Sequence, residues 1–353
     1  SEDGTPMPAS ATAAVREGNL DDKGKAAIDF GEITYNKPGE YTYEVREVAG
    51  ELGGITYSEN VATFKVTVTV KATGGLKADV EKISGKTEFK NTYGAKTETP
   101  LTLEATKTLT GRPMADDEFK FALSYAGHDE VLLNATNKGG KVEFGPLTYT
   151  TESLAKLVKE DKASRDASSD KPTWTIHYIA AEQTGELPAG VSATVSEIDA
   201  YVTVVDNGDG TLTATAVYGD AGNKFVNAYT VAPKDSSVTD QITATKVLTG
   251  REVGLVAGEF HFELVKGNNV VATGTNNADG KIIMDPITYT EAGEHTYRLR
   301  ETKAGATENG ITYSTAEYTI VTTITDNGDG TLKAEHVLKE DKKAEFTNSY
   351  KPG

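Results

Sequence analysis

Two lysines occupy positions where the alternation of the surrounding residues calls for an apolar side chain. In the stretch "LTLEATKTL", the residues that share the phase of Lys107 are Leu101, Leu103, Ala105 and Leu109. Around the later stretch "TATKVLTGR", the residues that share the phase of Lys246 are Ile242, Ala244 and Leu248. Because the side chains of a strand alternate between its two faces, both amines are expected to point into a core.

The same alternation directs one glutamate and one asparagine inward in each of three similar stretches. The asparagines of "FKNTY", "FVNAY" and "FTNSY" are Asn91, Asn227 and Asn348. The glutamates that end "YEVRE", "YIAAE" and "YRLRE" are Glu47, Glu182 and Glu301. A buried lysine or carboxylate is costly unless it is paired. Alternation alone therefore leaves two interpretations open: a buried Lys–Glu salt bridge with the asparagine as hydrogen-bond partner, or strand-end residues that reach solvent.

These motifs recur three times along the 353 residues with nearly constant spacing, which indicates three domains. The first, second and third repeats are expected to cover residues 1–94, 95–231 and 232–353. Between the motifs, strand-like alternation is interrupted by turn signals such as "NKPGE" and "DNGDG". The predicted fold is all-β, a tandem array of three immunoglobulin-like β-sandwiches. The second repeat is expected to carry a short helical insertion at 151–164.

Composition argues against several classes of function. The net charge of -17 disfavours nucleic-acid binding, and the absence of cysteine excludes disulfides and thiolate metal sites. No apolar run approaches the roughly 20 residues of a membrane span. The five histidines lack metal-ligand spacing, so neither a metal nor another cofactor is expected. A glycan-active enzyme is disfavoured because no acid pair recurs outside the turns and the inward-facing positions.

Taken in order, these motifs resemble the Gram-positive major-pilin and surface-adhesin domains that form intramolecular isopeptide bonds, of the FctA type. The resemblance rests on "K-x-L-T-G-R", the aromatic-rich strand ending in glutamate, the "DNGDGTL" hairpin and the closing "F-x-N-x-Y" strand. It covers nearly the whole chain. It implies a Lys107–Asn227 bond with Glu182 as catalyst, and a Lys246–Asn348 bond with Glu301 as catalyst.

The chemistry that the resemblance implies is consistent with burial, which disfavours the charged forms of amine and carboxyl group alike. A neutral amine could attack the asparagine side-chain carbonyl while the carboxylic acid polarises it and relays protons until ammonia leaves. Such a reaction is a single turnover without a cofactor, so the chain is not expected to be an enzyme.

Two repeats depart from the family pattern. The first has Glu47 and Asn91 but no counterpart of the two lysines, because Lys23 and Lys25 lie in a turn. It is expected to lack its N-terminal strand or strands, to form no isopeptide bond, and to expose a groove that a strand from a neighbouring chain could fill. In the second, "YIAAE" replaces "YxxRE", and Glu197 is the alternative to Glu182 as the catalytic residue.

The function favoured by the sequence is structural: a stalk or pilus-shaft segment of a secreted, cell-wall-anchored bacterial surface protein, with the anchor outside these residues. The expected partners are other domains of the same surface protein, with no membrane insertion. The alternative is a host-ligand-binding adhesin module that uses loops or the helical insertion, with an unknown ligand. Trp174 is expected to lie in the core, not in such a binding surface.

Overall fold

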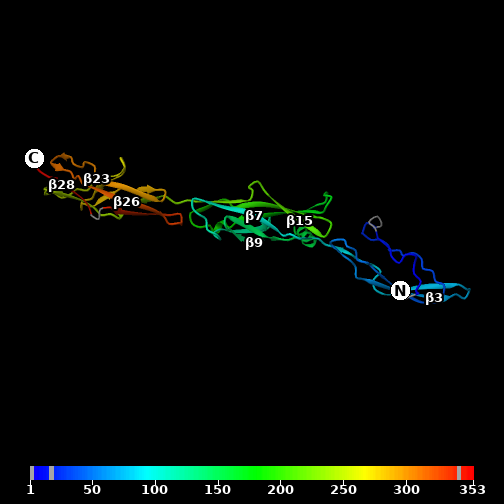
Figure 1. Cartoon of the computed structure of the whole chain (residues 1–353). Helices are drawn as coiled ribbons and strands as arrows, with labels where there is room; N and C mark the ends of the chain where they lie inside the picture. Colours follow the sequence, from blue (N-terminus) through cyan, green and yellow to red (C-terminus); the bar gives the residue numbers. More distant parts are fainter. Residues whose placement is uncertain (1–3, 16–19, 340–342) are drawn as a thin grey trace. The chain divides into compact units, whose positions relative to one another are not determined.

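The computed structural model describes residues 4–15, 20–339 and 343–353. The chain forms two compact units: residues 1–101, 146–176 and 202–215 in one, and residues 102–145, 177–201 and 216–353 in the other. Almost all regular structure is β-strand, coloured along the chain in Figure 1. The all-β prediction is confirmed.

The N-terminal part of the chain contains one small sheet and one short strand pair. The sheet has the order β1-β3-β4, with β1 (Gly39–Arg46), β3 (Val61–Val70) and β4 (Leu76–Ser84). The pair is β2 (Ile55–Thr56) with β5 (Thr92–Tyr93). The core of the sheet is small and consists of Tyr41, Val66 and Val68.

The middle of the chain contributes two larger sheets. One has the order β10-β7-β16-β13, with β10 (Lys141–Leu147), β7 (Leu101–Thr110), β16 (Lys224–Tyr229) and β13 (Val191–Val195). The other has the order β6-β15-β14-β12-β8-β9, with β6 (Lys96–Thr97), β15 (Thr211–Tyr218), β14 (Glu197–Asp206), β12 (Thr173–Glu182), β8 (Lys120–Tyr125) and β9 (Val131–Thr136). β11 (Ser164–Asp166) pairs with β12, and the short 3₁₀ helix η2 (Thr184–Glu186) follows β12. Trp174 is buried, as predicted.

The C-terminal part is built around two sheets whose apolar faces share one core. The first has the order β18-β28-β25-β24, with β18 (Ala244–Thr249), β28 (Ala344–Tyr350), β25 (Ile311–Thr312) and β24 (Thr307–Glu308). The second has the order β21-β20-β19-β23-β26-β27, with β21 (Ile282–Met284), β20 (Asn269–Asn276), β19 (His261–Lys266), β23 (Gly293–Glu301), β26 (Glu317–Asp326) and β27 (Leu332–Leu338). β17 (Lys234–Ser236) pairs with β22 (Ile287–Tyr289), and η3 (Val238–Asp240) follows β17. Both sheets supply fully buried side chains to this core, among them Phe262, Leu299 and Phe346.

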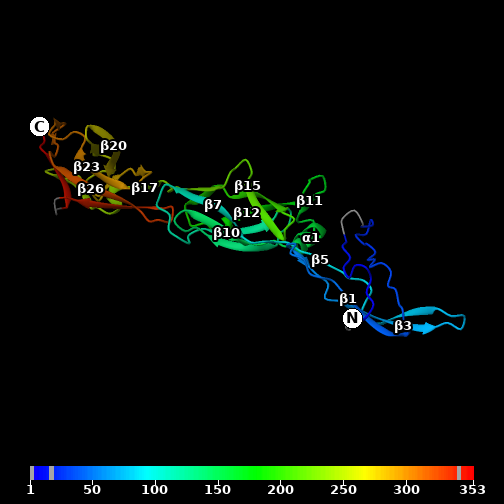
Figure 2. The same ribbon diagram turned by 45° about the vertical axis from the view of Figure 1, so that its right-hand side comes forward.

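The helical insertion is present but shorter than the sequence predicted. Helix α1 (Thr151–Lys159), a short green ribbon in Figure 2, begins where Thr150 and Ser153 satisfy each other's backbone amides. It ends before residue 164 because Asp161 adopts a positive φ of 59°, which a right-handed helix does not allow. The last residues of the predicted helix lie outside it, and strand β11 begins at residue 164. No helix in the described ranges is long and apolar enough to cross a membrane.

Candidate functional site

The third repeat brings Lys246, Glu301 and Asn348 together from three strands. β18 and β28 run parallel with Lys246 opposite Phe346, so Asn348, two residues further on, faces the same side as the lysine. Glu301 ends β23 in the other sheet of the same core. The two facing sheets thus place an amine, a carboxyl group and a carboxamide in one interior site.

The contacts among these three side chains are direct. Lys246 Nζ lies 3.1 Å from Glu301 Oε1 and donates to Oε2 at 3.4 Å. Asn348 Nδ2 donates to Glu301 Oε1 at 2.9 Å. All three residues are buried, with at most 2% of the lysine exposed, so the inward orientation read from the alternation is confirmed.

The surroundings of the amine favour its neutral form. Lys246 Nζ lies 4.5 Å from the centroid of the Phe260 ring and donates to the backbone oxygen of Phe346 at 3.2 Å. Burial lowers the pKa of Lys246, and the attraction of Glu301 opposes that shift only in part. A lowered pKa increases the fraction of neutral amine, which is the nucleophilic form of lysine.

The second repeat contains the same arrangement. Lys107 Nζ lies 2.6 Å from Glu182 Oε1, and Asn227 Nδ2 donates to the same oxygen at 2.9 Å. The side chains of the lysine and the glutamate are fully buried, and the Phe119 ring centroid lies 4.5 Å from Nζ. Burial again lowers the pKa of Lys107.

Strand register in the second repeat matches that of the third. β7 runs parallel to β16 with Lys107 opposite Phe225, so Asn227 again lies two residues beyond the lysine's partner and faces the same side. Glu197, the alternative named from the sequence, is exposed. The glutamate in contact with this lysine is therefore Glu182, despite the unusual sequence "YIAAE".

A backbone amide completes the third-repeat site and was missed by the sequence reasoning. The N–H of Ser314 donates to Asn348 Oδ1 at 2.7 Å and to Glu301 Oε2 at 3.2 Å. In the second repeat, no donor among the described residues reaches Asn227 Oδ1. The signal that could have revealed this amide is the pentapeptide "GITYS", which occurs at 54–58 and 310–314 and is replaced by "GVSAT" in the second repeat.

This arrangement is suited to joining the lysine and asparagine side chains. The lysine amine and the carboxamide are held in one buried site, which supplies the proximity that an inert amide requires. The amide of Ser314 points at the oxygen on which negative charge develops when an amine attacks Asn348. The glutamate contacts both reacting side chains and can move protons between them.

A comparison with known protein families gave a match along the chain. The family of FctA, Spy0128-like isopeptide-containing domains, matches residues 1–94, 103–230 and 242–351. The chain belongs to the FctA family. A comparison with curated proteins gave no match.

Solved structures with similarity to this FctA chain include two major pilins and a further bacterial protein. The major pilin from Streptococcus pyogenes is 15% identical, with 73% of this chain and 99% of that chain covered and a TM-score of 0.22. The Bacillus anthracis TIE protein is 13% identical, with coverages of 84% and 44% and a TM-score of 0.22. BcpA, the major pilin subunit of Bacillus cereus, is 14% identical, with coverages of 89% and 85% and a TM-score of 0.14.

The first FctA repeat holds the acidic and amide members of the site without the amine. Asn91 Nδ2 donates to Glu47 Oε1 at 2.7 Å. The N–H of Ser58 donates to Asn91 Oδ1 at 2.9 Å and to Glu47 Oε2 at 3.1 Å, the same bonds that Ser314 makes in the third repeat. Glu47 is half-buried and Asn91 exposed, so the site is open.

None of the described lysines contacts this pair. Lys25, one of the two lysines considered from the sequence, instead forms an exposed ion pair with Glu88 at 2.7 Å. Lys23 lies in the turn that begins at Asp21, whose carboxylate accepts from the Lys23 backbone N–H. Both lysines are therefore in the turn predicted from the sequence, away from Glu47 and Asn91.

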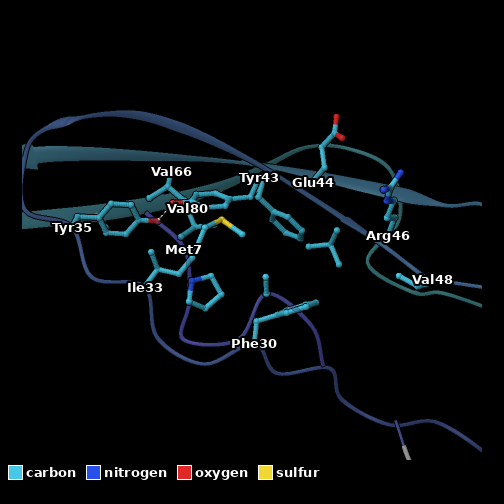
Figure 3. A pocket seen from close by; sticks show the side chains of 15 residues that line it. Met7, Phe30, Ile33, Tyr35, Tyr43, Glu44, Arg46, Val48, Val66 and Val80 are labelled. Carbon is cyan, nitrogen blue, oxygen red and sulfur yellow. Dashed lines mark hydrogen bonds between the residues drawn. The ribbon is translucent and has the colours of Figure 1, made fainter. Parts of the chain in front are cut away.

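An apolar groove of about 620 Å³ lies over the small sheet of the first FctA repeat. Figure 3 shows Met7, Ile33, Tyr35 and Tyr43 gathered around it, with the Glu44 carboxylate directed away. Val80 lines the groove and is 68% exposed, although its counterparts on a sandwich sheet would be covered by a second layer. The exposed groove predicted from the sequence is present.

In the larger sheet of the third FctA repeat, β23 has β19 beside it, whereas β1 has no described neighbour on its corresponding edge. The edge of β1 and the groove in the first repeat thus correspond to the positions that β19 and β18 fill in the third repeat.

Proposed function

We propose that this chain is a structural segment of a bacterial pilus shaft or surface stalk, with its second and third repeats each closed by an isopeptide bond. The bonds join Lys107 to Asn227 and Lys246 to Asn348. Membership of the FctA family supports the structural role, and the two buried Lys–Glu–Asn sites support the chemistry. The observation that carries the proposal is the glutamate oxygen shared by the lysine and the asparagine in both repeats.

The proposed reaction balances without a cofactor. The neutral amine of Lys246 attacks Cγ of Asn348, a C–N bond forms, and the Cγ–Nδ2 bond breaks to release ammonia. Glu301 takes the proton that the amine loses and returns one to the departing nitrogen. Glu182 has the same role between Lys107 and Asn227. Each site reacts once, so the chain is not a turnover enzyme.

The position of these bonds suits a protein under tension. In each of the two repeats the bond joins a strand near the start to the last strand, and these two strands are parallel neighbours. A pull along the chain would be carried by covalent bonds before it reached the hydrogen bonds between the strands. We propose three domains at residues 1–94, 95–231 and 232–353, in a protein displayed at the bacterial cell wall.

Intact mass of the denatured protein tests the chemistry. The parent is expected to weigh less than its sequence by the mass of two ammonia molecules, and Lys107→Ala and Lys246→Ala are each expected to restore one. Glu301→Ala is expected to restore one as well, because the proton relay is lost. A parent without any deficit would mean that the lysines are only ion-paired, and the adhesin alternative would then be favoured.

We further propose that the first repeat accepts lysine-bearing strands from outside the described residues and bonds them to Asn91. The ready-made contacts among Glu47, Asn91 and Ser58, together with the open apolar groove, support this proposal. The partner is a pair of strands like β18 and β19, from a neighbouring chain or another domain of the same surface protein.

A synthetic peptide of residues 242–266, which carries β18 and β19, tests this second proposal. Incubation with the full chain is expected to give a covalent adduct whose mass is the sum of the two minus one ammonia. Neither the Lys246→Ala peptide nor the Asn91→Ala chain should form the adduct. An adduct that persists with either variant, or none with the parent pair, would refute bonding at Asn91.

A further inference from the structure

The closing tyrosines of the first two repeats each bind the "DNGDG" hairpin of the repeat that follows. The Tyr93 hydroxyl donates to Asp206 Oδ1 at 2.6 Å, and the Tyr229 hydroxyl donates to Asp326 Oδ1 at 2.6 Å. Both tyrosines end an "F-x-N-x-Y" motif, and both aspartates are the first residue of the hairpin turn. The same contact therefore occurs twice, and we call each tyrosine with its hairpin, Tyr93 with 206–210 and Tyr229 with 326–330, a joint.

Each tyrosine hydroxyl also accepts a hydrogen bond from the same hairpin. The donors are the backbone N–H groups of Gly210, at 3.4 Å from Tyr93, and Gly330, at 3.1 Å from Tyr229. The hydrogen bond to the aspartate is the main reason why the pKa of each tyrosine is raised. Each joint is thus held by both the donor and the acceptor capacity of one hydroxyl.

Two glycines let the backbones of each joint come close together. A Cβ added at Gly190 would lie 2.7 Å from Gly330 Cα, and one added at Gly54 would lie 2.6 Å from Gly210 Cα. All four glycines have a positive φ, between 76° and 87°. Any other residue would be strained and would push the backbones apart.

The end of the third repeat has the tyrosine half of the same joint. Gly310 has a φ of 79°, and a Cβ built there would lie 3.0 Å from Tyr350 Cε2, compared with 2.8 Å between the Gly190 position and Tyr229 Cε2. The N–H of Lys351 donates to the Gly310 oxygen at 2.9 Å, as Thr230 does to Gly190. Within the described ranges, no hairpin contacts this half-joint.

We propose that Tyr350 and Gly310 form a docking site for the Asp-x-Gly-Asp-Gly hairpin of a further FctA-type domain. The recognition chemistry is a carboxylate that accepts from the tyrosine hydroxyl, followed by a glycine that fits against Gly310 and donates to the hydroxyl. Docking of a further domain at this site does not depend on the proposed isopeptide bonds.

Other hairpins of the chain do not suit this site. The hairpins at 206–210 and 326–330 already hold Tyr93 and Tyr229, so a second copy of the chain would offer neither in a free state. The hairpin between β3 and β4 has Val70 at the strand end where β14 and β26 have an aspartate, so it lacks the carboxylate. The occupant is therefore another domain that carries the complete turn.

Electron-spin distance measurements on an extended chain test the proposal. Residues 230–353 are appended directly after Tyr350, which reproduces the spacing of the Tyr229 joint. Because the chain has no cysteine, nitroxides can be attached at Val337→Cys in both copies of the third repeat. The reference pair across the Tyr229 joint is Val217→Cys with Val337→Cys, at matched positions that are 63% and 61% exposed.

The new pair is expected to give the same narrow distance distribution as the reference pair. Tyr350→Ala should remove the narrow peak of the new pair alone, and Tyr229→Ala that of the reference pair alone. Tyr350→Phe, which keeps the ring and removes the hydroxyl, should also weaken the peak. The proposal would be overturned if the distance distribution of the new pair were as broad in the parent as in Tyr350→Ala while that of the reference pair was narrow. So would a reference peak that survives Tyr229→Ala.

Discussion

Asn348→Ala is expected to lower the free energy of unfolding of the third repeat by about 5 kcal/mol. The bond from Lys246 to Asn348 would close a loop of about 100 residues, for which the chain-entropy estimate is about 4.7 kcal/mol. The lost hydrogen bonds, one donated to Glu301 and one accepted from the Ser314 N–H, together add about 1 kcal/mol. Because the cross-link cannot form in the variant, Lys246 and Glu301 stay paired as an amine and a carboxylate, and no unpaired buried charge is left.

Denaturant unfolding followed by amide hydrogen exchange in β18 and β28 measures this change repeat by repeat. Asn91→Ala is the matched control, because it removes the same side chain from the repeat in which no described lysine is near. That control should leave exchange in β18 and β28 unchanged. A loss of only about 1 kcal/mol in Asn348→Ala would correspond to a hydrogen bond alone and would contradict a cross-link.

In the second and third repeats the alternation of residues was sufficient to predict which polar side chains are buried. In the first repeat it was not, because Asn91 is exposed and Glu47 only half-buried where no second layer covers them. Lys107 and Lys246 keep the phase of apolar neighbours over most of a strand, and a side chain cannot leave that face without disrupting the strand. The same signal could not predict the donor at Ser314, because a backbone amide has no residue type to recognise. Only the repeated "GITYS" marks its position.

The contacts between repeats also could not be predicted from the sequence. The "DNGDG" turns were correctly expected to be hairpins, and Asn207 closes the first by donating to the Thr211 oxygen at 3.1 Å. Nothing in the turn itself shows that Asp206 binds Tyr93, which lies far away in the sequence. The end of helix α1 was misplaced for a local reason, since the positive φ of Asp161 is not apparent from residue types.

Glu301→Ala is expected to destabilise the third repeat more than Asn348→Ala does. Both variants should lack the cross-link, but only Glu301→Ala leaves the amine of Lys246 buried without its carboxylate. Removing one partner of a buried ion pair costs about 3–5 kcal/mol. The intact mass should show that the ammonia of this site is retained.

The stability of Glu301→Ala should also rise with pH. Burial already lowers the pKa of Lys246 below its ordinary value of 10.5, and the variant removes the carboxylate that opposes this shift. The folded state therefore binds the proton more weakly than the unfolded state. The free energy of unfolding should increase as the pH rises from the lowered pKa towards 10.5, and should be constant below that range. Denaturant midpoints measured across this range test the slope.

A double variant separates the destabilisation caused by the unpaired buried amine from that caused by the missing cross-link. Lys246→Met with Glu301→Ala removes both charges and keeps an apolar side chain of similar length beside Phe260. It should recover part of the stability lost in Glu301→Ala and show no dependence on pH over the range attributed to the lysine. Glu47→Ala, in the repeat without a contacting lysine, should leave the third repeat unchanged. If Glu301→Ala were no less stable than Asn348→Ala at neutral pH, the glutamate would not be the group that compensates the buried amine.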